Sequence, residues 1–261
     1  MAHLTDIELA CRLATEAGDL LARLRDEPGQ DDTPQLTGKA LKDAGDQAAQ
    51  AFLAADLARE RPGDAVLSEE AADDRSRLDA DRVWIIDPLD GTREFSEHRH
   101  DWAVHVALWD RATNDLIVGA VALPGLGVTL DSGSVTTGPP AAKDVKPKLA
   151  VSRSRPPAVA TEVAEALNAE LVPIGSAGYK ISAVIRAEVD AYVHAGGQYE
   201  WDSAAPVAVA RAAGLHTSRL DGSPLRYNQP DPYLPDLVVC RPELADRILK
   251  ITNNHTRTTT R

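Results

Sequence analysis

The stretch Val83–Phe95, VWIIDPLDGTREF, constrains this chain most, because an apolar run ends in two carboxylates. Its opening residues are apolar and favour β-structure, which is the pattern of a strand covered on both faces. Pro88 cannot donate to a strand ladder and Gly91 permits a tight bend, so we expect a sharp turn just past the strand. Such a turn places Asp87 and Asp90 around one point.

Two carboxylates at the end of a buried strand are suited to a hard cation. Carboxylate and backbone carbonyl oxygens are the ligands that Mg²⁺ prefers, and the Leu89 carbonyl lies between the two acids. Glu69 follows another apolar run, and Asp202 lies where a helix is expected to start. In the alternative interpretation Asp87 caps a turn and Asp90 is solvated. Because acids recur at several segment ends, the pattern favours the metal.

The composition excludes several classes of protein. A formal net charge of −12 leaves no basic stripe to displace counterions from a phosphate backbone, so we expect no nucleic-acid polymer as a partner. No apolar run approaches the roughly 18 residues of a membrane span, and the N-terminus lacks the pattern of a signal peptide. Cys11 and Cys240 match no metal spacing, which favours a soluble protein of the reducing cytoplasm.

The chain divides into two halves of different pattern. The first begins with a helix in which Thr5 and Glu8 form a capping box, with an apolar stripe at Leu9, Leu13, Leu20 and Leu24. A second helix is expected over about 44–59. Strands are expected over 65–67, 83–86, 102–108, 116–123 and 127–130, and their alternation indicates an antiparallel sheet.

The second half alternates strand and helix, as α/β layers do. Strands are expected over 149–151, 171–174, 190–194 and 237–240, and helices over 158–169, 179–188, 204–213 and 242–251. The segment Asp131–Lys148 is rich in Ser, Gly, Pro and Thr, which marks a boundary. We therefore expect an α+β domain over 1–135 and an α/β domain over 136–261 that completes the site. The polar tail Asn253–Arg261 is expected to fray.

Several competing catalytic motifs fail on spacing. Gly38-Lys39 is followed by Ala40, where a P-loop needs Ser or Thr. Pro88 and Leu89 interrupt the alternate oxygen ligands of an EF-hand. Phosphatases with an aspartyl nucleophile place paired acids two apart, whereas Asp87 and Asp90 are three apart. Water attacking under metal control remains.

Three segments in the correct order, Ser68–Glu70, Asp87–Thr92 and Trp201–Ala205, resemble the signatures of the inositol monophosphatase superfamily. The resemblance implies a layered αβαβα sugar-phosphatase fold and a lithium-sensitive, Mg²⁺-dependent phosphomonoesterase that forms a homodimer. It implies two or three Mg²⁺ per site, bound by Glu69, Asp87, the Leu89 carbonyl, Asp90 and Asp202. It also implies catalytic roles for Asp46, Glu69 and Thr92, with Asp46 and Thr92 orienting the attacking water.

Within that superfamily, Gly91–Phe95 resembles the Gly-Thr-Lys-Glu-Phe of CysQ-type 3′(2′),5′-bisphosphate nucleotidases. These enzymes hydrolyse 3′-phosphoadenosine 5′-phosphate (PAP) to AMP and phosphate, which clears a by-product of sulfate assimilation. The substrate contacts implied by the resemblance, together with cations suited to a second phosphate, are Gly91, Thr92, Ser152, Arg153, Ser154, Arg155, Gly175, Ser176, Lys180, Asp202 and Arg226.

Two alternative functions remain open at this point. The same metal centre would serve a phosphatase of inositol-1-phosphate or fructose-1,6-bisphosphate. Ala195 stands, by ungapped spacing from Asp202, where inositol phosphatases carry an acid for a sugar hydroxyl, which weakens that interpretation. A non-catalytic nucleotide or metal sensor on the same fold is the alternative from another class, and it would have no need of a water-orienting Thr92.

Overall fold

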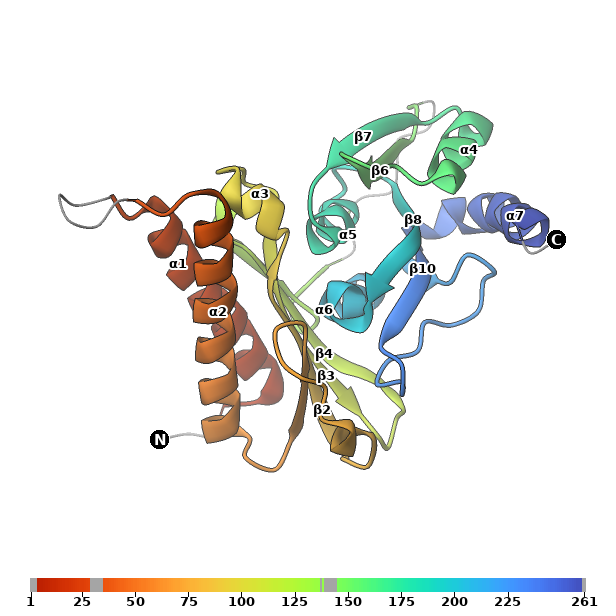
Figure 1. Ribbon diagram of the computed structural model, residues 1–261. Helices are drawn as coiled ribbons and strands as arrows, with labels where there is room; N and C mark the ends of the chain where they lie inside the picture. Colours follow the sequence, from red (N-terminus) through yellow and green to blue (C-terminus); the bar gives the residue numbers. More distant parts are fainter. Residues whose placement is uncertain (1–3, 29–34, 137, 139–144, 260–261) are drawn as a thin grey trace.

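The computed structural model describes residues 4–28, 35–136, 138 and 145–259 (Figure 1). The first sheet has the order β1-β2-β3-β4-β5 and the second the order β7-β6-β8-β10-β9. The helices are α1 (Asp6–Asp26), α2 (Gly38–Glu60), α3 (Thr92–Ser96), α4 (Ala158–Leu167), α5 (Ala177–Ile185), α6 (Glu200–Ala212) and α7 (Pro242–Thr259). The strands are β1 (Ala65–Ser68), β2 (Arg82–Asp90), β3 (Ala103–Asp110), β4 (Asp115–Leu123), β5 (Val128–Asp131), β6 (Lys148–Ser152), β7 (Glu170–Ile174), β8 (Ala191–Tyr199), β9 (His216–Ser218) and β10 (Tyr233–Cys240).

Helices α1 and α2 cover one face of the first sheet (Figure 1). The predicted capping box is confirmed, since Glu8 accepts from the Thr5 backbone at 2.8 Å and Thr5 caps the Glu8 amide. The predicted apolar stripe is partly wrong: Leu9 and Leu13 are buried, whereas Leu20 and Leu24 are half-buried. The helix instead continues its buried stripe through Ala17 and Leu21, because side chains four apart stay on one helical face.

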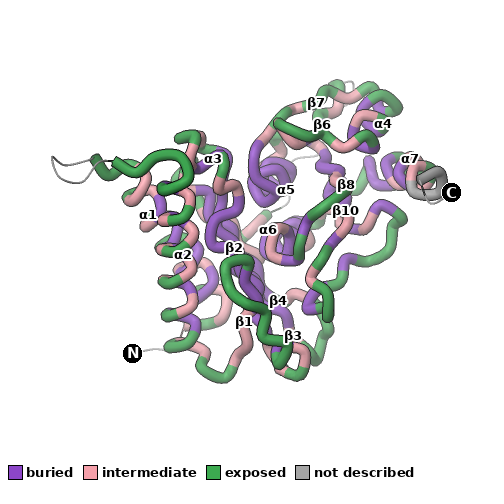
Figure 2. The backbone as a smooth tube through the Cα atoms, in the orientation of Figure 1, coloured by how far each residue is buried: buried purple, intermediate pink, exposed green. Residues whose placement is uncertain are grey.

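Helices α5 and α6 fill the space between the two sheets, and α4 and α7 cover the outer face of the second (Figure 1). All nine residues of α5 are buried, in keeping with its central place in Figure 2. Gly119 of β4 permits this packing, because a Cβ there would lie 2.5 Å from the Ala205 carbonyl of α6. The layers run αβαβα, which confirms the predicted fold class.

The two sheets differ in strand direction. β1 and β2 are parallel, and β2 to β5 run antiparallel, as the alternating pattern predicted. The second sheet is mixed, because β6 is parallel to β7 and β8 while β10 is antiparallel to β8 and β9. No helix within the described residues has both the length and the apolarity to cross a bilayer.

Two local expectations were wrong, and two short elements were missed. β2 continues through Asp90 instead of ending at Ile86, because a register shift against β3 accommodates Pro88 and delays the turn to Gly91, where φ is 91°. The short elements α3 and β9 were not predicted. The tail does not fray from Asn253, since α7 extends to Thr259.

The boundary between the two predicted domains is not decided by these elements. The first sheet ends at Asp131 and the second begins at Lys148, and residues 137 and 139–144 of the intervening loop lie outside the described part of the chain. The division into 1–135 and 136–261 therefore stays a prediction.

Candidate metal centre and active site

Three acids predicted as metal ligands converge between the sheets. Asp87 and Asp90 come from the end of β2, and Asp202 comes from the first turn of α6. Each offers one carboxylate oxygen, and these oxygens all lie within 4.8 Å of one another. Asp87 and Asp90 are only 1% and 6% exposed. Burying three like charges so closely is costly unless a cation or protons neutralise them.

Asp90 is held by donors from two elements. Its Oδ2 accepts from the Ser176 hydroxyl and the Gly178 amide, both at 2.6 Å, and its Oδ1 accepts from the Ala177 amide at 3.2 Å. These groups form the amino-terminal end of α5, where the helix dipole favours an anion. His105 Nε2 also lies 3.3 Å from Oδ2. Burial alone would raise the pKa of Asp90, but these donors lower it below the ordinary value.

Asp87 is in the opposite situation. Its Oδ1 accepts from the Leu89 amide at 3.0 Å, whereas its buried Oδ2 has no hydrogen-bond partner among the described residues. Burial, followed by the charges of Glu69 and Asp90, raises the pKa of Asp87 well above its usual range. A buried carboxylate oxygen that lacks a hydrogen-bond donor and lies among other acids needs a positive charge beside it.

The pKa values of two further acids are raised around the same point. Burial and the neighbouring Asp90 raise the pKa of Asp202 to about 6, although its Oδ2 accepts from the Tyr199 amide at 2.6 Å. Glu69 has an exposed side chain, yet desolvation and the charges of Asp202 and Asp90 raise its pKa to about 7. The donor set consists of hard oxygen atoms, so these residues fit a hard divalent cation.

The two residues predicted to orient water lie on separate elements. Thr92 opens α3, and its hydroxyl donates to the Leu89 carbonyl at 3.3 Å, not to Asp46. Asp46 is half-buried on α2. Burial and the charges of Glu70 and Asp43 raise the pKa of Asp46 to about 6.

The sequence of residues 4–257 matches the Inositol monophosphatase family. The chain belongs to this family. A 3′-phosphoadenosine 5′-phosphate phosphatase of Mycobacterium leprae is 54% identical over 264 residues, covering 96% of this chain and 94% of that protein. The 3′(2′),5′-bisphosphate nucleotidase CysQ of Escherichia coli is 29% identical, covering 87% of this chain and 96% of that protein.

A solved structure shows the same fold. The crystal structure of CysQ from Bacteroides thetaiotaomicron, described as a bacterial member of the inositol monophosphatase family, is 28% identical and has a TM-score of 0.76. The match covers 89% of this chain and 96% of that one. The predicted family and fold are confirmed. The family is metal-dependent, and the buried acidic cluster is suited to a metal.

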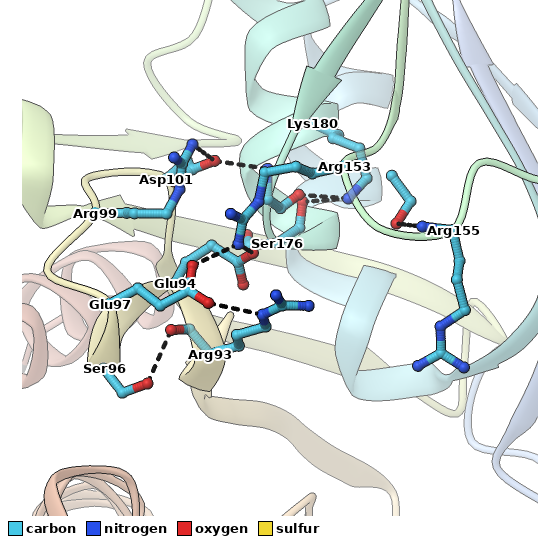
Figure 3. A network of polar contacts seen from close by, with 12 residues as sticks. Arg93, Glu94, Ser96, Glu97, Arg99, Asp101, Arg153, Arg155, Ser176 and Lys180 are labelled. Carbon is cyan, nitrogen blue, oxygen red and sulfur yellow. Dashed lines mark hydrogen bonds and ion pairs between the residues drawn. The ribbon is translucent and has the colours of Figure 1, made fainter. Parts of the chain in front are cut away.

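The segment that carries the subgroup resemblance joins the two halves of this family member (Figure 3). Arg153, which follows β6, bonds Glu94 at 2.8 Å and Glu97 at 2.7 Å, both on or next to α3. Gly175 donates its amide to Asp101 at 2.7 Å. The Arg153 guanidinium, which was predicted to contact substrate, is therefore paired with two carboxylates from the half of the chain that forms the first sheet.

The remaining predicted cations differ in exposure. Lys180 is 5% exposed, and its ammonium donates to the carbonyls of Gly175 and Ser176 instead of reaching solvent. Burial lowers the pKa of Lys180 to about 8. Arg155 is exposed and points away from the network in Figure 3. Its side chain and that of exposed Arg226 form no ion pair among the described residues.

Two of the other predicted contacts lie next to Asp90, and two lie in the loop after β6. Ser176 bonds Asp90 directly, and Gly91 begins the turn into α3. Ser152 accepts from the Arg155 amide at 3.3 Å, so it shapes the loop after β6, in which Ser154 is exposed.

His105 was not predicted as a site residue from the sequence. This residue was interpreted only as one face of an alternating strand, yet it is fully buried and contacts Asp90. A histidine inside the otherwise apolar strand Ala103–Trp109 is the signal that could have identified it. Burial alone would lower the pKa of His105, but Asp90 raises it above the ordinary value.

Proposed function

We propose that this protein is a Mg²⁺-dependent phosphomonoesterase that hydrolyses PAP to AMP and phosphate. The observation that carries the proposal is the convergence of Asp87, Asp90 and Asp202 with one buried oxygen left unpaired. The substrate is supported by the M. leprae relative, at 54% identity over most of both chains. We further propose a cytoplasmic, lithium-sensitive homodimer that serves sulfate assimilation.

Five groups would hold two or three Mg²⁺ ions in this proposal: Glu69, Asp87, the Leu89 carbonyl, Asp90 and Asp202. Bound Mg²⁺ would supply Lewis-acid stabilisation of phosphoryl charge and acidification of a coordinated water. Asp90 arrives already oriented by α5, whereas the other acids repel one another until a cation is present. Cation binding would therefore neutralise the acids that the protein itself does not stabilise with hydrogen-bond donors.

We propose that Thr92 orients the attacking water. Because its hydroxyl hydrogen is directed at the Leu89 carbonyl, its lone pairs remain able to accept from a water molecule. The raised pKa of Asp46, about 6, suits a group that takes up a proton near neutral pH. The amino-terminal end of α6, next to Asp202, is suited to phosphoryl oxygens.

Arg155 and Arg226 are the predicted cations that form no ion pair among the described residues, and we propose Arg155 as a contact for the second phosphate of a bisphosphate substrate. Arg153 is paired with Glu94 and Glu97, and Lys180 is buried against carbonyls, so neither is free in this arrangement. Arg155→Ala is expected to raise KM for PAP about tenfold, because one charge-assisted contact is lost. KM for inositol-1-phosphate should not change, since that substrate has no second phosphate.

Arg93→Ala is the matched control, because Arg93 is also an exposed arginine but pairs with Glu97. An equal rise in KM for PAP in both variants would mean that long-range charge, not a contact with Arg155, decides the affinity.

The test of the function is a comparison of substrates. Phosphate release from PAP, inositol-1-phosphate and fructose-1,6-bisphosphate is measured in parallel, with and without Mg²⁺, with Asp87→Asn as the blank. A dominant Mg²⁺-dependent kcat/KM for PAP is expected, because loops outside the metal centre supply the difference in transition-state binding. Higher kcat/KM for either sugar phosphate would replace the nucleotidase with a sugar phosphatase.

A further inference from the structure

His105 lies on β3 at the point where four elements meet. Its side chain is fully buried. Its Nδ1 lies 3.0 Å from the Trp201 carbonyl in the first turn of α6. Its Nε2 lies 3.3 Å from Asp90 Oδ2 at the end of β2, and Asp87 Oδ2 is 4.0 Å from Nδ1. One imidazole therefore touches both elements that carry the acids of the cluster.

The hydrogen bond to Trp201 determines which nitrogen of the His105 ring carries a hydrogen. A carbonyl oxygen only accepts hydrogen bonds, so Nδ1 donates to Trp201 and Nε2 is left facing Asp90. Trp201 immediately precedes Asp202 in the sequence. A displacement of His105 is thus transmitted to Asp90 on one side and to the backbone that carries Asp202 on the other.

Helix α5 closes the remaining side of the ring. A Cβ built on Gly178 would lie 1.9 Å from His105 Nε2 and 3.0 Å from Asp90 Oδ2. The Gly178 amide meanwhile donates to the same Asp90 oxygen at 2.6 Å. Only glycine allows α5 to approach closely enough for the amide and the imidazole to meet one carboxylate oxygen. The ring is packed against backbone on both sides and has little freedom to move.

We propose that His105 is a positioning residue that sets the distance between Asp90 and Asp202, and thereby the affinity of the acidic cluster for a divalent cation. This inference rests on the proposed function, because it concerns the same cation site. It assigns to His105 no contact with substrate. The outer partners of ligating groups typically contribute 10- to 100-fold in metal affinity, and His105 contacts one proposed ligand and the residue before another.

The test separates metal affinity from packing. His105→Leu and His105→Asn are compared with wild type in metal-free buffer and during Mg²⁺ titration, following the melting temperature and the heat of binding. His105→Leu should weaken Mg²⁺ binding about 10- to 100-fold, and His105→Asn should recover part of that loss because its amide can still donate one hydrogen bond. KM for PAP measured at saturating Mg²⁺ should change little.

Val106→Ala is the matched control, because Val106 is the next residue of β3, fully buried and on the opposite face, in the core under α1 and α2. It should lower the melting temperature without shifting the Mg²⁺ midpoint. If His105→Leu binds Mg²⁺ as wild type does, His105 only fills space and the inference is overturned. If wild type itself binds no Mg²⁺, the proposed function fails as well.

Discussion

Asp87 and Asp90 lie three positions apart at the end of one strand, are both buried, and have opposite surroundings. Asp90 accepts three hydrogen bonds from the start of α5 and is contacted by His105. Asp87 accepts one backbone hydrogen bond and has an oxygen with no donor. We therefore propose that the protein stabilises Asp90 itself and leaves Asp87 to a cation, so that Asp90 is an anchor and Asp87 is the more cation-dependent group.

The largest effect is expected for Asp87→Asn. Turnover of PAP should fall by about 10²- to 10³-fold or more, because an electrostatic contribution to the transition state is lost. The metal-free protein should nevertheless melt at a higher temperature than wild type, since a buried charge without a counter-ion is removed. A lower melting temperature in metal-free buffer would show that Asp87 has a structural partner.

Asp90→Asn should also abolish turnover but with the opposite effect on stability. The asparagine cannot accept charge-assisted hydrogen bonds from Ser176, Ala177 and Gly178 in the same way. We expect the free energy of unfolding in metal-free buffer to fall by about 1.5–3 kcal/mol, measured by denaturant titration. Equal changes for the Asp87 and Asp90 variants would remove the distinction between anchor and cation-dependent ligand.

Gly178→Ala tests the close approach of α5. Its Cβ would lie 1.9 Å from His105 Nε2, so the helix must shift and the Asp90 contacts must lengthen. The free energy of unfolding should drop by about 1–3 kcal/mol in the same assay. Gly63→Ala is the control, because among the described residues no heavy atom beyond its chain neighbours lies within 4 Å of its Cβ position. Similar losses for both variants would contradict a specific clash at His105.

The smallest effect is expected from the ionisation of Glu69. With a pKa raised to about 7, folded Glu69 retains a proton that the unfolded chain releases from about pH 4.3 upward. Wild type therefore loses stability as pH rises through this interval, and Glu69→Gln should lose less because the contribution of Glu69 is removed. In metal-free buffer, the melting temperature of Glu69→Gln minus that of wild type should increase from pH 5 to pH 8. If this difference in melting temperature does not change with pH, the pKa of Glu69 is not raised and the prediction is wrong.

The sequence was most informative where chemistry is local. Asp87, Leu89 and Asp90 share one strand end, so their convergence follows from a short segment that can be read directly. The role of His105 could not be read in this way, because its partner Trp201 is 96 residues away. Likewise Arg153 bonds Glu94 across 59 residues, and this link between the two halves could not be read from either segment alone.

Local rules also failed where packing overrides them. Pro88 should end a strand, but the register shift against β3 lets β2 continue and carries Asp90 into the reach of α5. Lys180 has the sequence context of an exposed phosphate ligand, yet the carbonyls of Gly175 and Ser176 hold its ammonium in the interior. Both outcomes depend on where α5 sits between the sheets, which no short motif specifies.

The central claim is that the acidic cluster holds the Mg²⁺ that supports hydrolysis of PAP. Its most direct test is a Mg²⁺ titration of phosphate release from PAP by wild type and by Asp87→Asn, with Mg²⁺-induced melting shifts recorded on the same samples. We expect wild-type release and melting temperature to rise together with Mg²⁺, and the folded variant to show neither change. Phosphate release by wild type without divalent cations, or a full rate in the variant, would contradict the account.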